Sequence, residues 1–143
     1  MADTVRVDYL YPPNMLDGDW DEKQGNRRVV VKLSGESDGT GETDIVKVDL
    51  SDLKTLNGNV PTRTAIEKIE YSVWGMICKL EWDRAPHKVI YIMNDSEGVI
   101  SWERIGGFVD PGGDDRTGDI LLTTTGGAAG DTYEITLTIR LKD

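Results

Sequence analysis

Apolar and polar residues alternate with a period of two along most of this chain. The clearest case is the segment 132–142, in which every second residue is apolar: Tyr133, Ile135, Leu137, Ile139 and Leu141. Because successive side chains of a β-strand point to opposite faces, this pattern predicts a strand with one buried face. No fixed-period repeat and no alternation of strands with helices interrupts the pattern.

The same rhythm predicts strands earlier in the chain. We expect them at 5–11, 27–33, 44–50, 66–83, 87–93, 99–105 and 120–125. Gly75 should divide the segment 66–83 as a turn or bulge, and the polar residues 94–98 should close a hairpin. Ser51 should cap a short helical turn, and the Gly-, Pro- and Asp-rich stretch 106–119 should be an ordered loop.

About eight short strands separated by turn signals are typical of a sandwich. The predicted fold class is therefore all-β, an antiparallel and jelly-roll-like β-sandwich. Residues 1–26 differ from the rest, because Pro12 and Pro13 stop any strand ladder and a polar stretch follows. We predict an extended N-terminal arm at 1–26 and a β-sandwich domain at 27–143.

The net charge of −10 narrows the range of partners. Nucleic-acid binding depends on clustered Lys and Arg, and anionic membranes repel an acidic surface, so neither partner is expected. Cys78 is the only cysteine, which excludes an intramolecular disulfide. With no signal-like segment at the start and no long apolar run, we expect the chain to be made and folded in a cytoplasm.

Two clusters of aspartates invite comparison with calcium loops. Asp17, Asp19 and Asp21 have the alternate spacing of such a loop, but its sixth and twelfth positions hold Glu22 and Arg28 instead of glycine and a bidentate glutamate. The second cluster is looser and comprises Asp110, Asp114, Asp115 and Asp119. We predict solvated acidic loops with no metal or cofactor, and calcium bridging is the alternative.

Other candidate chemistry is sparse. His87, the only histidine, has no specific nucleophile and acid around it, so we interpret it as a surface residue at the start of a strand and expect no enzymatic activity. Cys78 is interpreted as a buried small hydrophobe. The tryptophans, at 20, 74, 82 and 102, could form a carbohydrate-stacking platform, but most fall on apolar strand faces. Trp20 is the exception, since it lies among aspartates.

The segments that join the strands resemble a known family. SDGTGET followed by VKVDLS, AIEKIEYSVWGM, LEWD, the glycine-rich loop, TGDILLTT and GDTYEITLTIRLK is similar, in that order, to small bacteriophage virion proteins. The resemblance covers about residues 27–143. It implies a capsid decoration, or cement, protein that is made in the bacterial host, binds the outside of an icosahedral head and belongs to the virion.

The resemblance also implies the partners. These are the major capsid protein and further copies of the chain itself, as a trimer or dimer. We expect the arm to contact a neighbour through its apolar side chains, namely Val5, Val7, Tyr9, Tyr11 and Trp20. The alternatives are a carbohydrate- or host-receptor-binding module that uses Trp20 or the loop 106–119, and a neck or tail component.

Overall fold

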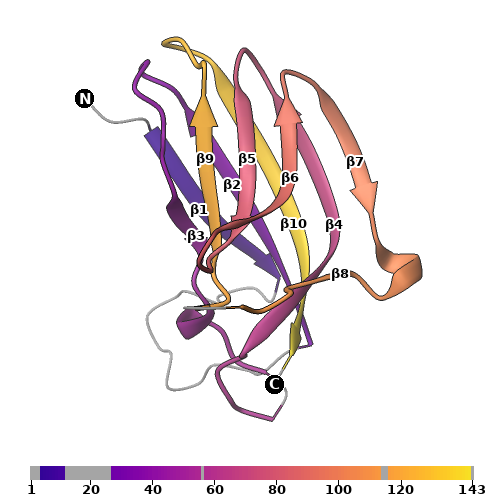
Figure 1. Cartoon of the computed structure of the whole chain (residues 1–143). Coiled ribbons are helices and arrows are strands. Elements are labelled where there is room, and N and C mark those ends of the chain that lie inside the picture. The colour runs from indigo at the N-terminus through magenta and orange to yellow at the C-terminus, as the bar shows by residue number, and fades with distance from the viewer. Residues whose placement is uncertain (1–3, 12–26, 56, 114–115, 143) are drawn as a thin grey trace.

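The computed structural model describes residues 4–11, 27–55, 57–113 and 116–142. They form two antiparallel β-sheets that lie face to face (Figure 1). The strands are β1 (Thr4–Tyr11), β2 (Arg28–Glu36), β3 (Ile45–Val48), β4 (Arg63–Val73), β5 (Ile77–Trp82), β6 (Lys88–Asn94), β7 (Glu97–Ser101), β8 (Phe108–Val109), β9 (Ile120–Thr125) and β10 (Thr132–Lys142). The predicted all-β, antiparallel and sandwich-like architecture is confirmed.

The larger sheet has six strands in the order β1-β2-β10-β4-β7, with β8 paired to β4, and the smaller sheet has the order β3-β9-β5-β6. Strand β10 lies at the centre of the larger sheet. Its residue Leu137 is paired with Val31 of β2 and Ile69 of β4, and all three are fully buried. The uninterrupted alternation of 132–142 therefore reflects a strand with neighbours on both sides and the interior on one face.

The interior between the sheets is filled by apolar side chains of both layers. The smaller sheet contributes fully buried residues of β5 and β9, for example Leu80, Trp82 and Leu122. The opposite residues of β5, such as Lys79 and Glu81, face outward, because Leu80 and Trp82 take the inward positions. The outer face of the smaller sheet is thus where its polar side chains gather.

Strand β1 is an edge strand of the larger sheet. It pairs with β2 from Thr4 to Tyr11, with an irregularity near its end. Val7 and Tyr9 pack against the core, but no residue of β1 is fully buried. Residues 4–11 thus belong to the larger sheet, and the division of the chain at residue 26 stays a prediction.

The predicted hairpin of 87–93 and 99–105 is wrong. Strand β6 pairs with β5 in the smaller sheet, whereas β7 pairs with β4 in the larger one. The connection between them crosses from one sheet to the other beside the turn at Gly75, whose N–H donates to Oδ1 of Asp95. Alternation shows which face of a strand is buried, but it does not show which strand lies beside it.

The short helical segments also differ from expectation. Asp49, not Ser51, caps η2 (Leu50–Asp52), a 3-10 helix of one turn, because its Oδ1 accepts a hydrogen bond from the backbone N–H of Ser51. A second 3-10 turn, η3 (Glu103–Ile105), replaces the end of the predicted strand 99–105. Among the described residues, no helix is long and apolar enough to cross a membrane.

Candidate metal centre

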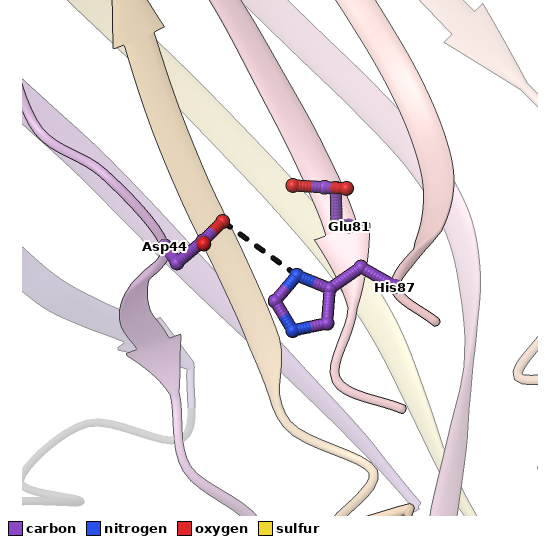
Figure 2. A group of neighbouring side chains, drawn as sticks. All are labelled: Asp44, Glu81 and His87. Atoms are coloured by element: carbon purple, nitrogen blue, oxygen red, sulfur yellow. Dashed lines mark ion pairs between the residues drawn. The ribbon is translucent and has the colours of Figure 1, made fainter. Parts of the chain in front are cut away.

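Three potential metal ligands converge on the outer face of the smaller sheet. They are Asp44, just before β3, Glu81 in β5, and His87, just before β6 (Figure 2). One ligand atom from each side chain lies within 4.8 Å of the other two. Strand β9 lies between β3 and β5 in this sheet, so sheet pairing brings together residues that are distant in the sequence.

Glu81 is the most enclosed member of the group. It sits at the irregularity in the pairing of β5 with β6, where the register shifts between Leu80 and Glu81. Its side chain is only 8% exposed, although it faces outward. Its carboxylate forms an ion pair with Nζ of Lys79 at 3.7 Å, which is too long for a hydrogen bond.

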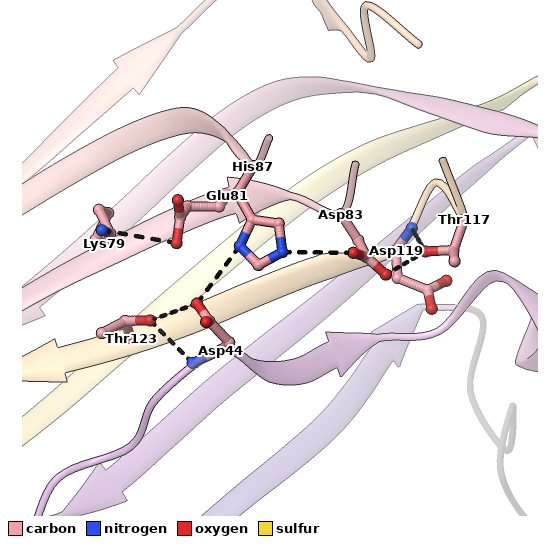
Figure 3. Close-up of polar contacts among 8 residues, drawn as sticks. All are labelled: Asp44, Lys79, Glu81, Asp83, His87, Thr117, Asp119 and Thr123. Carbon is pink, nitrogen blue, oxygen red and sulfur yellow. Dashed lines mark hydrogen bonds and ion pairs between the residues drawn. The ribbon is translucent and has the colours of Figure 1, made fainter. Parts of the chain in front are cut away.

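Asp44 is held in place by Thr123 of the neighbouring strand β9. Its backbone N–H donates to Oγ1 of Thr123, and that hydroxyl donates in turn to Oδ1 of Asp44 (Figure 3). Asp44 also has a φ of 48°, in the left-handed region that aspartate tolerates better than most residues. This conformation and the two hydrogen bonds fix the carboxylate beside the histidine.

His87 lies between two carboxylates. Its Nδ1 is 3.6 Å from Oδ1 of Asp44, and its Nε2 is 3.7 Å from Oδ1 of Asp83 on the other side of the ring (Figure 3). Asp83 is oriented by Thr117, whose hydroxyl donates to Oδ2 at 2.7 Å. Each carboxylate beside the imidazole is therefore positioned by its own threonine.

The site carries an excess of negative charge. Three carboxylates, on Asp44, Glu81 and Asp83, surround the imidazole, and Lys79 is the nearby cation. Asp119 is close by, and burial raises the pKa of its carboxyl above the ordinary value, an effect that the charges of Asp49 and Asp83 increase. The arrangement is suited to holding a cation.

The sequence alone did not reveal this site. The sequence indicates a surface residue at a strand start for His87, and the structure does place it just before β6 with a side chain that is 35% exposed. The spacing of Glu81, Asp83 and His87 is a weak signal, because β5 ends at Trp82 and His87 lies beyond it, just before β6. Asp44 lies far upstream, and only the position of β9 brings it near.

The aspartates considered for calcium are placed differently. Asp17, Asp19, Asp21, Asp114 and Asp115 lie outside the described residues. Asp110 is buried, and its Oδ1 accepts from the backbone N–H of Gly112; Oδ1 of Asp119 accepts from the N–H of Leu50. The carboxylate of Asp110 thus closes a local turn, whereas that of Asp119 joins the segment before β9 to the start of η2.

The predicted partner-binding residues fall on the edge strand. Val5 and Tyr11 are exposed, whereas Val7 and Tyr9 turn their side chains toward the core, and burial raises the pKa of the Tyr9 hydroxyl. Trp20 lies outside the described residues. The contact of this strand with a partner stays a prediction.

Most of the other residues that the sequence suggests as functional candidates, namely the cysteine and the tryptophans, have structural roles. Cys78 is fully buried, as expected, and burial raises the pKa of its thiol to about 12, with a smaller effect from the charge of Glu42. Trp82 is buried, and Trp102 packs edge-on against Phe108. Trp74, at the turn after β4, is 67% exposed.

Comparison of the chain with protein-family models, curated proteins and solved structures finds no match. Function is therefore inferred from geometry and from the sequence.

Proposed function

We propose that the sandwich is a jelly roll. Without the two-residue β8, eight strands run from β2 to β10. The first of these strands pairs with the last, the second with the seventh, the third with the sixth and the fourth with the fifth. The pairs are β2 with β10, β3 with β9, β4 with β7, and β5 with β6. This is the pairing of one long antiparallel hairpin wound into two sheets, the arrangement of a double-sheet jelly roll. Strand β1 extends it at one edge.

Jelly rolls are used by viral capsid proteins, lectins and cupins. Cupins use the inside of the barrel for chemistry, but here the interior is closed by large buried side chains, among them Trp82 and Met93. The potential metal ligands instead lie on the outside of the smaller sheet. The arrangement favours a protein that acts through its surface, without an enzymatic activity.

The function that this geometry supports best is that of a bacteriophage virion structural protein. The chain decorates the outside of the head, binds the major capsid protein and further copies of itself, and stabilises the shell. The observation that carries the proposal is the strand pairing of a jelly roll, together with the order of segments that resembles virion proteins. The net charge of −10 keeps free copies apart before assembly.

The contact with a neighbour is made by the edge of β1. Among the described residues, β1 has a strand beside it on one side only, and Val5 and Tyr11 are 40% and 49% exposed. An unpaired edge can accept a strand from another chain, which joins two proteins through backbone hydrogen bonds. Every copy on a symmetric shell makes the same contact. The many weak contacts together therefore hold the shell more strongly than one contact could.

Cosedimentation with capsids that lack the protein tests this proposal. Wild-type protein should pellet with the capsids, and Val5→Asp combined with Tyr11→Asp should weaken binding about tenfold or more. Val99→Asp is the matched control, because Val99 is an exposed valine on β7, at the opposite edge of the same sheet. Equal binding by all three proteins contradicts a contact through β1, and no binding by wild type contradicts the decoration role.

Carbohydrate binding is the second candidate, and one observation favours it. The exposed Trp74 borders an open hollow of about 450 Å³ whose other lining residues include Arg6, Ser34 and Glu134. Indole faces stack on sugar rings, and polar groups beside them can bind hydroxyls. A glycan array compares the two functions: binding that Trp74→Ala abolishes supports a receptor-binding module.

A further inference from the structure

We propose that Asp44, Glu81 and His87 form a binding site for a divalent transition-metal ion, with Zn²⁺ as the ion used to test it. The site is separate from the edge of β1 and does not depend on the virion role. It also departs from the expectation, drawn from the sequence, that the protein binds no metal.

The spacing of the donor atoms fits a shared ion. Zn²⁺ takes nitrogen and carboxylate ligands at about 2.0–2.2 Å, so two ligands of a tetrahedral ion lie about 3.4 Å apart. Nδ1 of His87 and Oδ1 of Asp44 are 3.6 Å apart, which is too long for a hydrogen bond but close to this spacing. A carboxylate oxygen of Glu81 completes the group within 4.8 Å.

The environment of Glu81 is the second, independent observation. Its side chain is more than nine-tenths buried, and among the described residues its ion pair is with Nζ of Lys79, at 3.7 Å, which is longer than a hydrogen bond. A buried charge is costly unless it is paired or coordinates a metal. Figure 2 shows its carboxylate on the same side of the sheet as Asp44 and the imidazole. An ion bound there would give Glu81 a closer partner than Lys79.

The surrounding residues resemble the supporting groups of known metal sites. A histidine ligand usually presents its second ring nitrogen to a carboxylate, which fixes the tautomer and the orientation of the ring. Asp83 lies 3.7 Å from Nε2, which is longer than a hydrogen bond, but its negative charge favours a proton on that nitrogen, and Thr117 holds the carboxylate there. Thr123 holds the ligand Asp44 in the same way. His87 thus binds through Nδ1 and keeps its proton on Nε2.

The donor types select the class of ion. Ca²⁺ takes six to eight oxygen ligands, whereas an imidazole with two carboxylates suits a transition-metal ion. Three protein ligands leave a fourth position of Zn²⁺ open for water or for a group of a partner. The ion would link the beginnings of β3 and β6 to the end of β5. Because β3 and β6 are the edge strands of the smaller sheet, it would connect both edges to an inner strand.

The test uses the full chain, freed of any tag and stripped with EDTA. His87 is the only histidine, so the imidazole resonances in a ¹H–¹⁵N NMR spectrum report on this site alone. One equivalent of Zn²⁺ should shift the Nδ1 resonance to the range of a metal-bound nitrogen, with the proton on Nε2. Calorimetry should give one ion per chain, and the thermal midpoint should rise by several degrees with excess Zn²⁺.

Two variants assign the binding to the site. His87→Gln and Glu81→Gln should each lower the Zn²⁺ affinity about a hundredfold and abolish the thermal shift, while Glu134→Gln, an exposed glutamate on the other sheet, should bind as wild type does. Circular dichroism of the metal-free variants verifies folding. Undiminished binding by the folded His87→Gln variant, or an imidazole spectrum unchanged by Zn²⁺, overturns the proposal.

Discussion

A hydrogen bond joins Tyr133, in the larger sheet, to Glu42, in the connection that leads into β3 of the smaller sheet. The hydroxyl of Tyr133, in β10 of the larger sheet, donates to Oε2 of Glu42 at 2.6 Å, and Oε1 of the same carboxylate lies 2.5 Å from Nζ of Lys47 in β3. The side chains of Lys47 and Glu42 are 2% and 7% exposed. A buried ion pair therefore connects the beginning of the smaller sheet to the central strand of the larger one.

Loss of one partner of this pair should be costly. Glu42→Gln leaves the buried ammonium of Lys47 without a counter-ion and should lower the free energy of unfolding by about 3–5 kcal/mol. Tyr133→Phe keeps the ion pair but removes the hydroxyl that donates to Glu42, and it should cost about 1–3 kcal/mol. Urea unfolding followed by circular dichroism measures both.

The double variant Glu42→Leu with Lys47→Met is the control for this prediction. It removes both charges and should recover most of the stability, because a buried ion pair is often no better than apolar residues of similar size. If Glu42→Gln is as stable as wild type, the pair is not buried as described.

The central strand offers a second prediction. Leu137→Asp places a charge in the fully buried centre of the larger sheet and should prevent folding, since the cost of several kcal/mol is comparable to a total stability of about 5–15 kcal/mol. Thr136→Asp, one residue away on the outer face beside Lys32 of β2, should fold. Circular dichroism distinguishes them, and equal damage by both would show that the outer face is also covered.

Removal of the edge strand should weaken the fold without abolishing it. A chain lacking residues 1–11 loses the pairing of β1 with β2 and the packing of Val7 and Tyr9, but it keeps the fully buried residues of the core. The thermal midpoint should fall by several degrees while the far-ultraviolet spectrum stays that of a β-protein. If the truncated chain is unfolded, β1 is required for folding. If the thermal midpoint is unchanged, the pairing of β1 with β2 does not contribute to stability.

Cys78 gives a direct probe of the core. Because burial raises the pKa of its thiol to about 12 from 9.0, the native protein holds the proton at pH 8.5 and also shields the sulfur. Between these two pKa values the unfolded chain releases the proton first, so stability should fall as the pH rises through this range.

Labelling with a disulfide reagent at pH 8.5 tests this prediction. The reagent should modify one thiol per chain in denaturant, and native protein only at the slow rate of global opening. Rapid labelling of the native protein would contradict the burial of β5.

How much of this structure the sequence predicts depends on whether a feature is local. The inward positions of 132–142 and the burial of Cys78 follow from alternation along one strand, and both are confirmed. The partner of β6 does not follow, because residues 94–98 read equally well as a hairpin turn and as a crossing between sheets. The grouping of Asp44 with Glu81 depends on β9 lying between their strands, which no local pattern encodes.

The proposed virion role is tested most directly by quantitative mass spectrometry of phage particles that are purified on a gradient from cultures that produce this chain. The protein should be present in a constant ratio to the major capsid protein in every preparation, as expected for a component bound at symmetric positions on the shell. When intact particles are treated with increasing denaturant, this protein should also dissociate at a lower concentration than the major capsid protein. Particles that infect normally and contain no copies of the chain would contradict the role as a capsid decoration protein.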